Sequence, residues 1–313
     1  MSRGMTPKEW AAYRGYAGAA WLARTLPERI GRRMFLALGS LAHATLAGVR
    51  TTVEGNQAQV LGLPADDPLV RAAGREAFAL YARYWHDGFR AGLMSPEELN
   101  RRFVTRGAGN IDRALERGSG CICVLPHMGN WDVAGAWLAA RYPGRAATVA
   151  EELKPPRLTE LFFRQRAEYG LHVVTLSANG QVGRQLVRLL KDNYVLGLVA
   201  DRDLTGRGIE VEMFGRPRRV PAGPALLSIK TGAPLLACPV RTSGRDWLCS
   251  MDPVDHEPSG NLKRDVEQIT RRIAGYFERA IAEYPPDWHL FQRGWGVDVR
   301  AAPSGTNRVE SRP

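Results

Sequence analysis

Several features that would assign this sequence to a familiar class are missing from it. The cysteines Cys121, Cys123, Cys238 and Cys249 lack the paired spacing of metal ligands, so we expect reduced core residues of an intracellular protein and no metal site. The N-terminus has no basic region followed by an apolar core and a cleavage site, which argues against a secretory signal. The most apolar helical stretch, residues 34–49, is interrupted by polar residues and is short for a bilayer span. We therefore expect a soluble or peripheral protein.

Motifs of two functional classes are also absent. Without a Gly-x-Ser-x-Gly elbow, a serine lipid hydrolase is disfavoured, and without a helix-turn-helix, zinc or RNA-binding signature, no nucleic-acid partner is expected. The 313 residues show no repeat and have an ordinary globular composition, but their formal net charge is +11. That charge indicates an anionic partner, such as a phosphate-bearing ligand or an acidic membrane surface.

The sequence does contain a distinctive turn near its middle. The apolar residues 121–125 predict a buried strand, and Gly129 and Asn130 follow as turn and cap residues of a helix. His127 would then lie at the edge of a sheet, with Asp132 in the first helical turn. A histidine oriented by a carboxylate is a general base. Taken alone, the turn also fits a lone loop histidine and an Asp that favours the helix N-terminus.

Strands and helices alternate after this turn. We expect strands over residues 147–150, 173–176 and 195–200, with helices over 156–168 and 181–191 between them. This alternation indicates an α/β fold whose central sheet is mostly parallel, mixed and flanked by helices. We predict a single domain over residues 1–300, mainly helical over 1–105 and α/β over 106–300. The polar tail 301–313 should be disordered.

The N-terminal part should form two helices broken near Pro27. Trp10 and Trp21 alternate with arginines such as Arg14 and Arg29, a pattern of helices that lie among anionic headgroups. We therefore expect a helical membrane-facing segment. A helical pair that packs on the core with a solvated basic edge explains the same pattern.

Charged segments follow three of the predicted strands and could bind substrate. Carboxylates at the carboxyl end of a strand point into the crevice where open α/β sheets bind ligands, and arginines beside a helix start suit phosphates. Each segment in isolation also fits a solvated loop. The candidates are Glu151, Glu152, Arg164, Arg166, Asp201, Arg202, Asp203, Arg216, Arg218 and Arg219.

Taken together, these segments resemble a known family. His127 to Asp132 is similar to the HxxxxD motif of the glycerolipid acyltransferase superfamily. The order of blocks from Arg117 to Trp295 resembles the branch that contains lipid A lauroyl/myristoyl acyltransferases and phosphatidylinositol mannoside acyltransferases. Asp132 and residues 200–204 are closer to the actinobacterial phosphatidylinositol mannoside enzymes.

The resemblance implies a peripheral enzyme on the cytoplasmic face of the cell membrane. It would move a long-chain acyl group, palmitoyl by expectation, from acyl-CoA to a mannose hydroxyl of a phosphatidylinositol mannoside, with no cofactor. His127 would be the base and Asp132 would orient it. The carboxylates and Arg166 would grip the acceptor, and the 216–219 arginines would bind CoA phosphates. A lipid A-type enzyme that uses acyl-carrier protein, a lipid hydrolase or thioesterase, and a non-catalytic lipid-binding protein remain alternatives.

Overall fold

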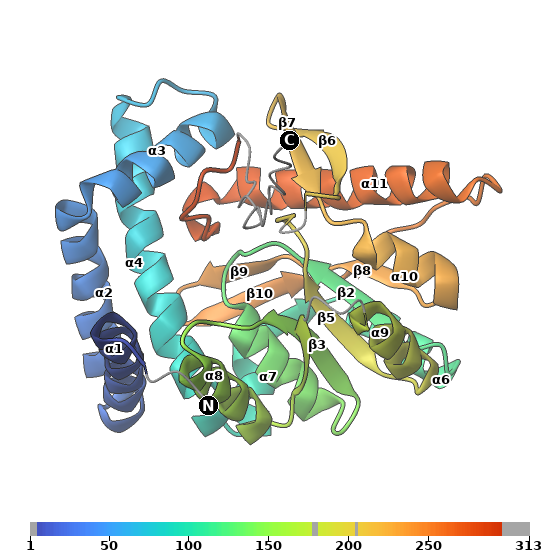
Figure 1. The fold of residues 1–313 in the computed structure, drawn as a ribbon, viewed down its shortest axis with the longest axis horizontal. Coiled ribbons are helices and arrows are strands. Elements are labelled where there is room, and N and C mark those ends of the chain that lie inside the picture. The colour runs from blue at the N-terminus through green and yellow to red at the C-terminus, as the bar shows by residue number, and fades with distance from the viewer. Residues whose placement is uncertain (1–4, 177–180, 204–205, 296–313) are drawn as a thin grey trace, which may run out of the picture.

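The centre of the molecule is a six-stranded sheet with the strand order β11-β8-β2-β5-β3-β4 (Figure 1). All neighbouring strands in it run parallel except β11, which is antiparallel to β8. This computed structural model describes residues 5–176, 181–203 and 206–295, so the predicted tail 301–313 lies outside the described residues. The strands are β2 (Cys121–Leu125), β3 (Ala146–Glu151), β4 (His172–Leu176), β5 (Val195–Val199), β8 (Leu235–Ala237) and β11 (Asp252–Pro253). The mostly parallel, mixed sheet expected from the alternating pattern is confirmed.

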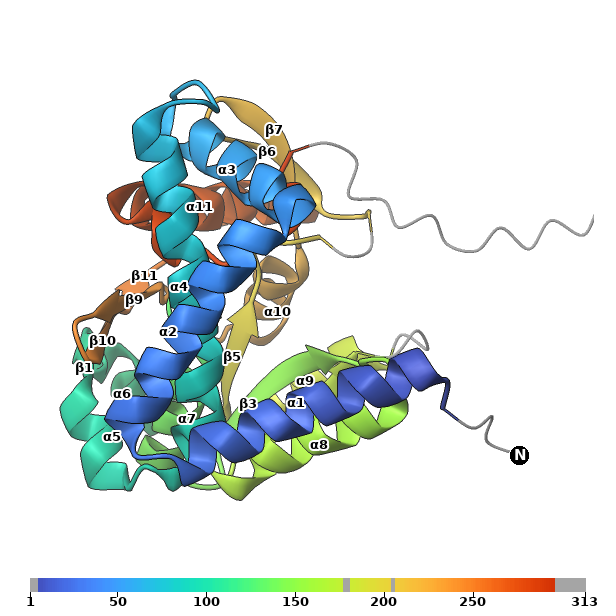
Figure 2. The same ribbon diagram turned by 90° about the vertical axis from the view of Figure 1, so that its left-hand side faces the viewer.

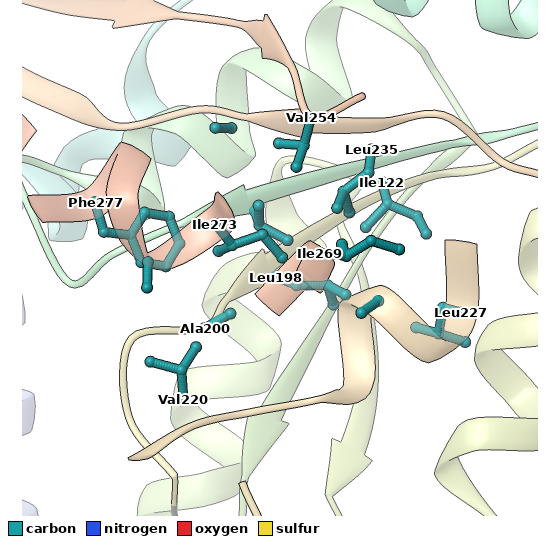
Figure 3. Packing of buried hydrophobic residues seen from close by; sticks show 14 of the residues in the cluster. Ile122, Leu198, Ala200, Val220, Leu227, Leu235, Val254, Ile269, Ile273 and Phe277 are labelled. Carbon is teal, nitrogen blue, oxygen red and sulfur yellow. The ribbon is translucent and has the colours of Figure 1, made fainter. Parts of the chain in front are cut away.

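Helices cover both faces of this sheet, as a parallel sheet requires. On one face lie α9 (Val182–Lys191), α10 (Gly223–Thr231) and α11 (Leu262–Glu283). Helix α11 buries Ile269, Ile273 and Phe277, which are spaced four residues apart, against Ile122 and Leu198 of the sheet (Figure 3). The opposite face is packed by α6 (Gly109–Glu116) and α7 (Trp131–Arg141).

Two smaller sheets complete the β-structure. β10 (Asp246–Ser250) pairs in parallel with β1 (Phe103–Arg106) and antiparallel with β9 (Val240–Ser243). β6 (Ile209–Met213) and β7 (Arg216–Val220) form an antiparallel hairpin. Residues 216–219, predicted as a cationic patch beside a helix start with a solvated loop as the alternative, are part of a strand.

The N-terminal third is helical, as predicted. Its helices are α1 (Pro7–Thr25), α2 (Glu28–Thr45), α3 (Ala47–Leu61), α4 (Pro68–Arg90) and α5 (Pro96–Arg102), with a 3-10 turn η1 (Ala91–Leu93) between the last two. The predicted break near Pro27 is confirmed. Gly39 lets α2 approach α4 closely, because a Cβ there would lie 2.6 Å from the carbonyl oxygen of Phe78.

Helix α1 lies alongside α8 (Pro156–Glu168) at one end of the molecule (Figure 2). Arg24 of α1 forms an ion pair with Glu168 of α8 at 2.8 Å, and Tyr16 donates a hydrogen bond to Gln165 at 3.1 Å. Within the described ranges, every helix is too short or too polar to cross a bilayer.

Candidate active site

The turn between β2 and α7 carries His127, and local residues determine its shape. Gly129 has φ of +63°, and a Cβ at this position would overlap the carbonyl oxygen of Val240. Only glycine fits both requirements. Asn130 then caps α7, because its Oδ1 accepts a hydrogen bond from the Val133 amide at 3.0 Å. The predicted strand, turn and cap are confirmed.

The register of β2 and β5 places His127 opposite Asp201. Leu125 pairs with Val199 at the ends of the two parallel strands, and each strand continues for two residues to its functional side chain. The Nδ1 of His127 lies 2.5 Å from Oδ1 of Asp201. The Asp201 side chain is fully buried, while that of His127 is 23% exposed. The imidazole therefore bridges a buried carboxylate and an accessible space.

Asp201 is an ionised hydrogen-bond acceptor. Burial opposes ionisation, but the charge and hydrogen bond of His127, the charge of Arg218 and a hydrogen bond from Trp288 hold the pKa of Asp201 below its ordinary value. Because an ionised carboxylate can only accept, Nδ1 of His127 carries the hydrogen of this contact, and in the neutral imidazole the lone pair is then on Nε2. This is the tautomer that a general base requires.

Asp132 does not occupy the position expected for it beside His127. Its Oδ2 accepts a hydrogen bond from the Tyr84 hydroxyl at 2.6 Å, and its Oδ1 pairs with Arg166. The carboxylate of Asp132 raises the pKa of Arg166, although burial opposes this. The predicted orienting contact between Asp132 and His127 is thus wrong: both Asp132 oxygens bind partners on α4 and α8, and Asp201 orients the imidazole.

The closing segment, residues 284–291, packs against the His127 turn. The amide of His289 donates to the carbonyl oxygen of His127 at 2.7 Å, and the amide of Gly129 donates to that of Asp287 at 3.0 Å. Burial lowers the pKa of His289 to about 3, so the ring is neutral and its Nε2 donates to the Gly129 carbonyl at 2.9 Å. Trp288 Nε1 donates to Oδ2 of Asp201 at 2.9 Å. The sequence analysis did not identify Trp288 as a partner of Asp201.

A largely apolar cavity of about 390 Å³ begins at His127. It lies between the central sheet and α7, with α8 along one side. Apolar side chains from several elements form most of its wall, and Glu151, Arg166 and Arg202 also border it. Representative apolar wall residues are Leu125, Trp137, Val149, Phe162 and Leu198.

The other residues predicted to bind substrate do not all lie at this cavity. Glu152 and Arg164 are exposed. Arg202 donates to Oε1 of Gln292 at 2.6 Å, and Asp203 accepts from the Gly208 amide at 2.6 Å. Arg216 is exposed at the start of β7.

Two neighbouring arginines of β7 differ in their environment. Arg219 is exposed and donates to the carbonyl oxygen of Gly206 at 2.7 Å. Arg218 is 6% exposed and donates to the carbonyl oxygen of Asp201 at 3.0 Å from Nη2 and 3.3 Å from Nε. Alternate residues of a strand face opposite sides, so the prediction that all three arginines form one phosphate-binding patch is wrong for Arg218.

Comparison with known proteins gives one consistent answer. The sequence profile of the family described as bacterial lipid A biosynthesis acyltransferase matches residues 3–296. The chain belongs to this acyltransferase family. It is 39% identical over 301 residues to the phosphatidylinositol mannoside acyltransferase of Mycobacterium tuberculosis strain CDC 1551 / Oshkosh, covering 94% of this chain and 90% of the relative. The protein of the same name from Mycolicibacterium smegmatis is 38% identical over 289 residues, or 91% of each chain.

Membership in the acyltransferase family agrees with the arrangement around His127. A histidine that contacts a buried carboxylate stands beside an apolar cavity. The family assignment identifies the chain as an enzyme that transfers acyl groups, and this cavity is the candidate site.

Proposed function

We propose that this enzyme transfers a long-chain acyl group, palmitoyl by preference, from acyl-CoA to a mannose hydroxyl of a phosphatidylinositol mannoside. The observation that carries the proposal is the 2.5 Å contact of His127 with buried Asp201 at an apolar cavity. The mycobacterial relatives named above support this class of acceptor.

The reaction needs no covalent enzyme intermediate. Nε2 of His127 takes the proton of the acceptor hydroxyl, and the hydroxyl oxygen attacks the carbonyl carbon of the thioester. The tetrahedral intermediate collapses, the carbon–sulfur bond breaks, and the departing thiolate receives the proton from Nε2. The products are an ester and free CoA thiol. Asp201 stabilises the transient imidazolium, as the carboxylate does in other histidine bases.

The cavity provides the environment that an acyl chain requires. Its wall is built mainly from apolar side chains of β2, β3, β5 and α7, and burial of a chain there would contribute about 0.8 kcal/mol per methylene. Glu151 and Arg202, which border the cavity, are the polar groups available to the headgroup of the acceptor. Exposed Arg216 and Arg219 remain candidates for the phosphates of CoA.

The N-terminal helices favour binding at the cytoplasmic surface of the cell membrane. Trp21 of α1 is 64% exposed, and Ile30 and Leu41 of α2 are 56% and 58% exposed. The exposed Arg29 and Arg33 lie on α2. Exposed apolar side chains among arginines suit an interface with anionic lipids.

Thiol release from palmitoyl-CoA tests the reaction. We expect release that depends on phosphatidylinositol mannosides, with mass spectrometry showing one added acyl group on the acceptor. His127→Ala should abolish transfer, and the exposed His172 provides a control, because His172→Ala should leave it unchanged.

The other outcomes identify rival functions. Release that is independent of any acceptor would indicate a thioesterase. No release from any acyl-CoA, with transfer from acyl-carrier protein, would contradict the proposed donor. Transfer that survives in His127→Ala would contradict the proposed base.

Vesicle sedimentation tests the membrane surface. Binding to anionic vesicles should weaken in a Trp21→Ser, Leu41→Ser variant and with added salt, while transfer to a short-chain, water-soluble acceptor should persist. Equal binding of both proteins to these vesicles would contradict this part of the proposal.

A further inference from the structure

Behind the His127–Asp201 pair lies a buried cation that the acyl-transfer step above does not use. The guanidinium of Arg218 lies over the ring of Trp288 at 5.2 Å and over that of Trp295 at 5.7 Å. Nη1 donates to the carbonyl oxygen of Gly294, while Nε and Nη2 donate to that of Asp201. One arginine thus connects β7, the end of β5 and the closing segment.

Trp288 links this cation to the carboxylate itself. The indole is 1% exposed, one of its faces lies under Arg218, and its N–H binds Oδ2 of Asp201. Oδ1 of Asp201 faces His127. Asp201 is therefore held at its backbone carbonyl by Arg218 and at its two carboxylate oxygens by His127 and Trp288. Its side chain is fully buried.

A buried charge at this position needs a reason, because burial of a guanidinium without a partner is unfavourable. Two backbone carbonyls accept hydrogen bonds from Arg218, and its guanidinium lies over two indole rings. Its charge also acts on Asp201 directly, and is one of the causes that lower the pKa of that carboxyl group.

We propose that Arg218 and Trp288 are positioning residues of the acyl-transfer site, which fix Asp201 and disfavour an additional proton on the His127–Asp201 pair. This inference rests on the proposed function of His127 as the base. Of the other ionisable groups around the pair, His289 is neutral, Arg166 is paired with Asp132, and Glu151 and Arg202 border the cavity. Arg218 is the buried cation that contacts Asp201 directly, so we expect it to bias the pair most strongly.

The pH dependence of kcat/KM tests this role. At low pH the pair binds an additional proton, and Nε2 of His127 can then not take the proton of the mannoside hydroxyl. The value of kcat/KM therefore falls along an acidic limb of the pH profile. Arg218→Gln removes a positive charge, and Trp288→Phe keeps an aromatic ring but removes the N–H donor and part of the face beneath Arg218. In both variants the pair should bind its proton more tightly, and the limb should move to higher pH, by about one unit for Arg218→Gln. Activity should then recover toward the wild-type value as pH rises.

Matched variants separate this role from a merely structural one. Arg219→Gln changes an exposed arginine of the same strand and should leave the limb in place. Arg218→Lys keeps the charge and should keep the limb close to that of the wild type, even if the rate falls. Should Arg218→Gln fail to fold, as circular dichroism would reveal, Trp288→Phe and Arg218→Lys still decide the question.

The outcomes also separate this inference from the proposed function. Equal loss of rate at every pH in the Arg218 and Trp288 variants would overturn the inference. A shift of the acidic limb in Arg219→Gln as large as that in Arg218→Gln would overturn it too. Transfer that persists in His127→Ala would instead overturn the assignment of the base.

Discussion

His127 and Asp201 meet at 2.5 Å although 74 residues separate them in the chain. The contact arises because β2 and β5 are neighbours in the sheet and each functional side chain follows its strand by two residues. Asp132, only five positions from His127, instead holds Arg166 and Tyr84. The two aspartates of the site therefore perform separate tasks.

Replacement of each aspartate should produce a different defect. Asp201→Asn leaves the shape intact but replaces the acceptor-only carboxylate by an amide. Its oxygen can accept from Trp288 while its NH2 donates to Nδ1 of His127 and favours the other tautomer, so kcat should fall by about 10²-fold or more with little change in thermal stability. Asp132→Asn breaks the buried pair with Arg166 and should cost about 3–5 kcal/mol of folding stability. Steady-state kinetics and urea unfolding of both variants check this. Equal kinetic and stability defects in the two would contradict the division of tasks.

The β2 strand, the turn after it and the carboxylate at the end of β5 could be predicted from the sequence, because apolar runs that end in Pro, Gly or Asp mark strand ends. That β2 and β5 are neighbours in the sheet could not be predicted. β3 and β4 lie between β2 and β5 in the chain, but β2 and β5 are adjacent in the sheet. Spacing along the chain made Asp132 the nearer partner, whereas strand order brings Asp201 to the imidazole.

The burial of Arg218 could not be predicted for a different reason. The residues Arg-Pro-Arg-Arg-Val of β7 show too little apolar alternation to reveal a strand. Only the tertiary contacts, two indole faces and two backbone carbonyls, make its burial favourable. The neighbouring Arg219, with the same side chain, remains in solvent.

The depth of the cavity should control which acyl chains are accepted. Gly197 of β5 lines the cavity, and a Cβ there would find its nearest side-chain neighbour, Leu138 Cδ2, at 3.8 Å. Gly197→Ala should fit without loss, whereas Gly197→Leu should fill part of the cavity and shift preference from palmitoyl-CoA toward lauroyl-CoA. Ratios of kcat/KM for the two donors measure this. An unchanged ratio in Gly197→Leu would place the acyl chain elsewhere.

The turn that carries His127 should tolerate no side chain at Gly129. Gly129→Ala would meet both a positive φ and the Val240 carbonyl, so activity should be lost together with more than about 1 kcal/mol of stability. Gly144 has φ of +71° and open space around it. Gly144→Ala thus reports the backbone cost alone. Thermal unfolding of both variants should show the larger loss at Gly129, and equal losses would mean that the Val240 contact is unimportant.

Acid should destabilise the protein through His289. Burial lowers the pKa of His289 to about 3 from its ordinary 6.5, so between these values the unfolded state binds a proton that the native state excludes. The stability contributed by this neutral ring is complete above pH 6.5 and is lost as pH falls, by up to about 1.4 kcal/mol per unit.

Asp287 acts in the opposite direction, because burial raises its pKa to about 6 from 3.8. Its contribution is present below pH 3.8 and is lost as pH rises through 6, so the two residues partly cancel in the wild type. His289→Gln keeps an Nε2 donor for the Gly129 carbonyl but cannot be protonated. Urea unfolding from pH 7 to pH 4 should therefore show this variant gaining stability relative to the wild type as pH falls. Parallel stability curves would mean that His289 binds its proton equally well in the native and the unfolded state.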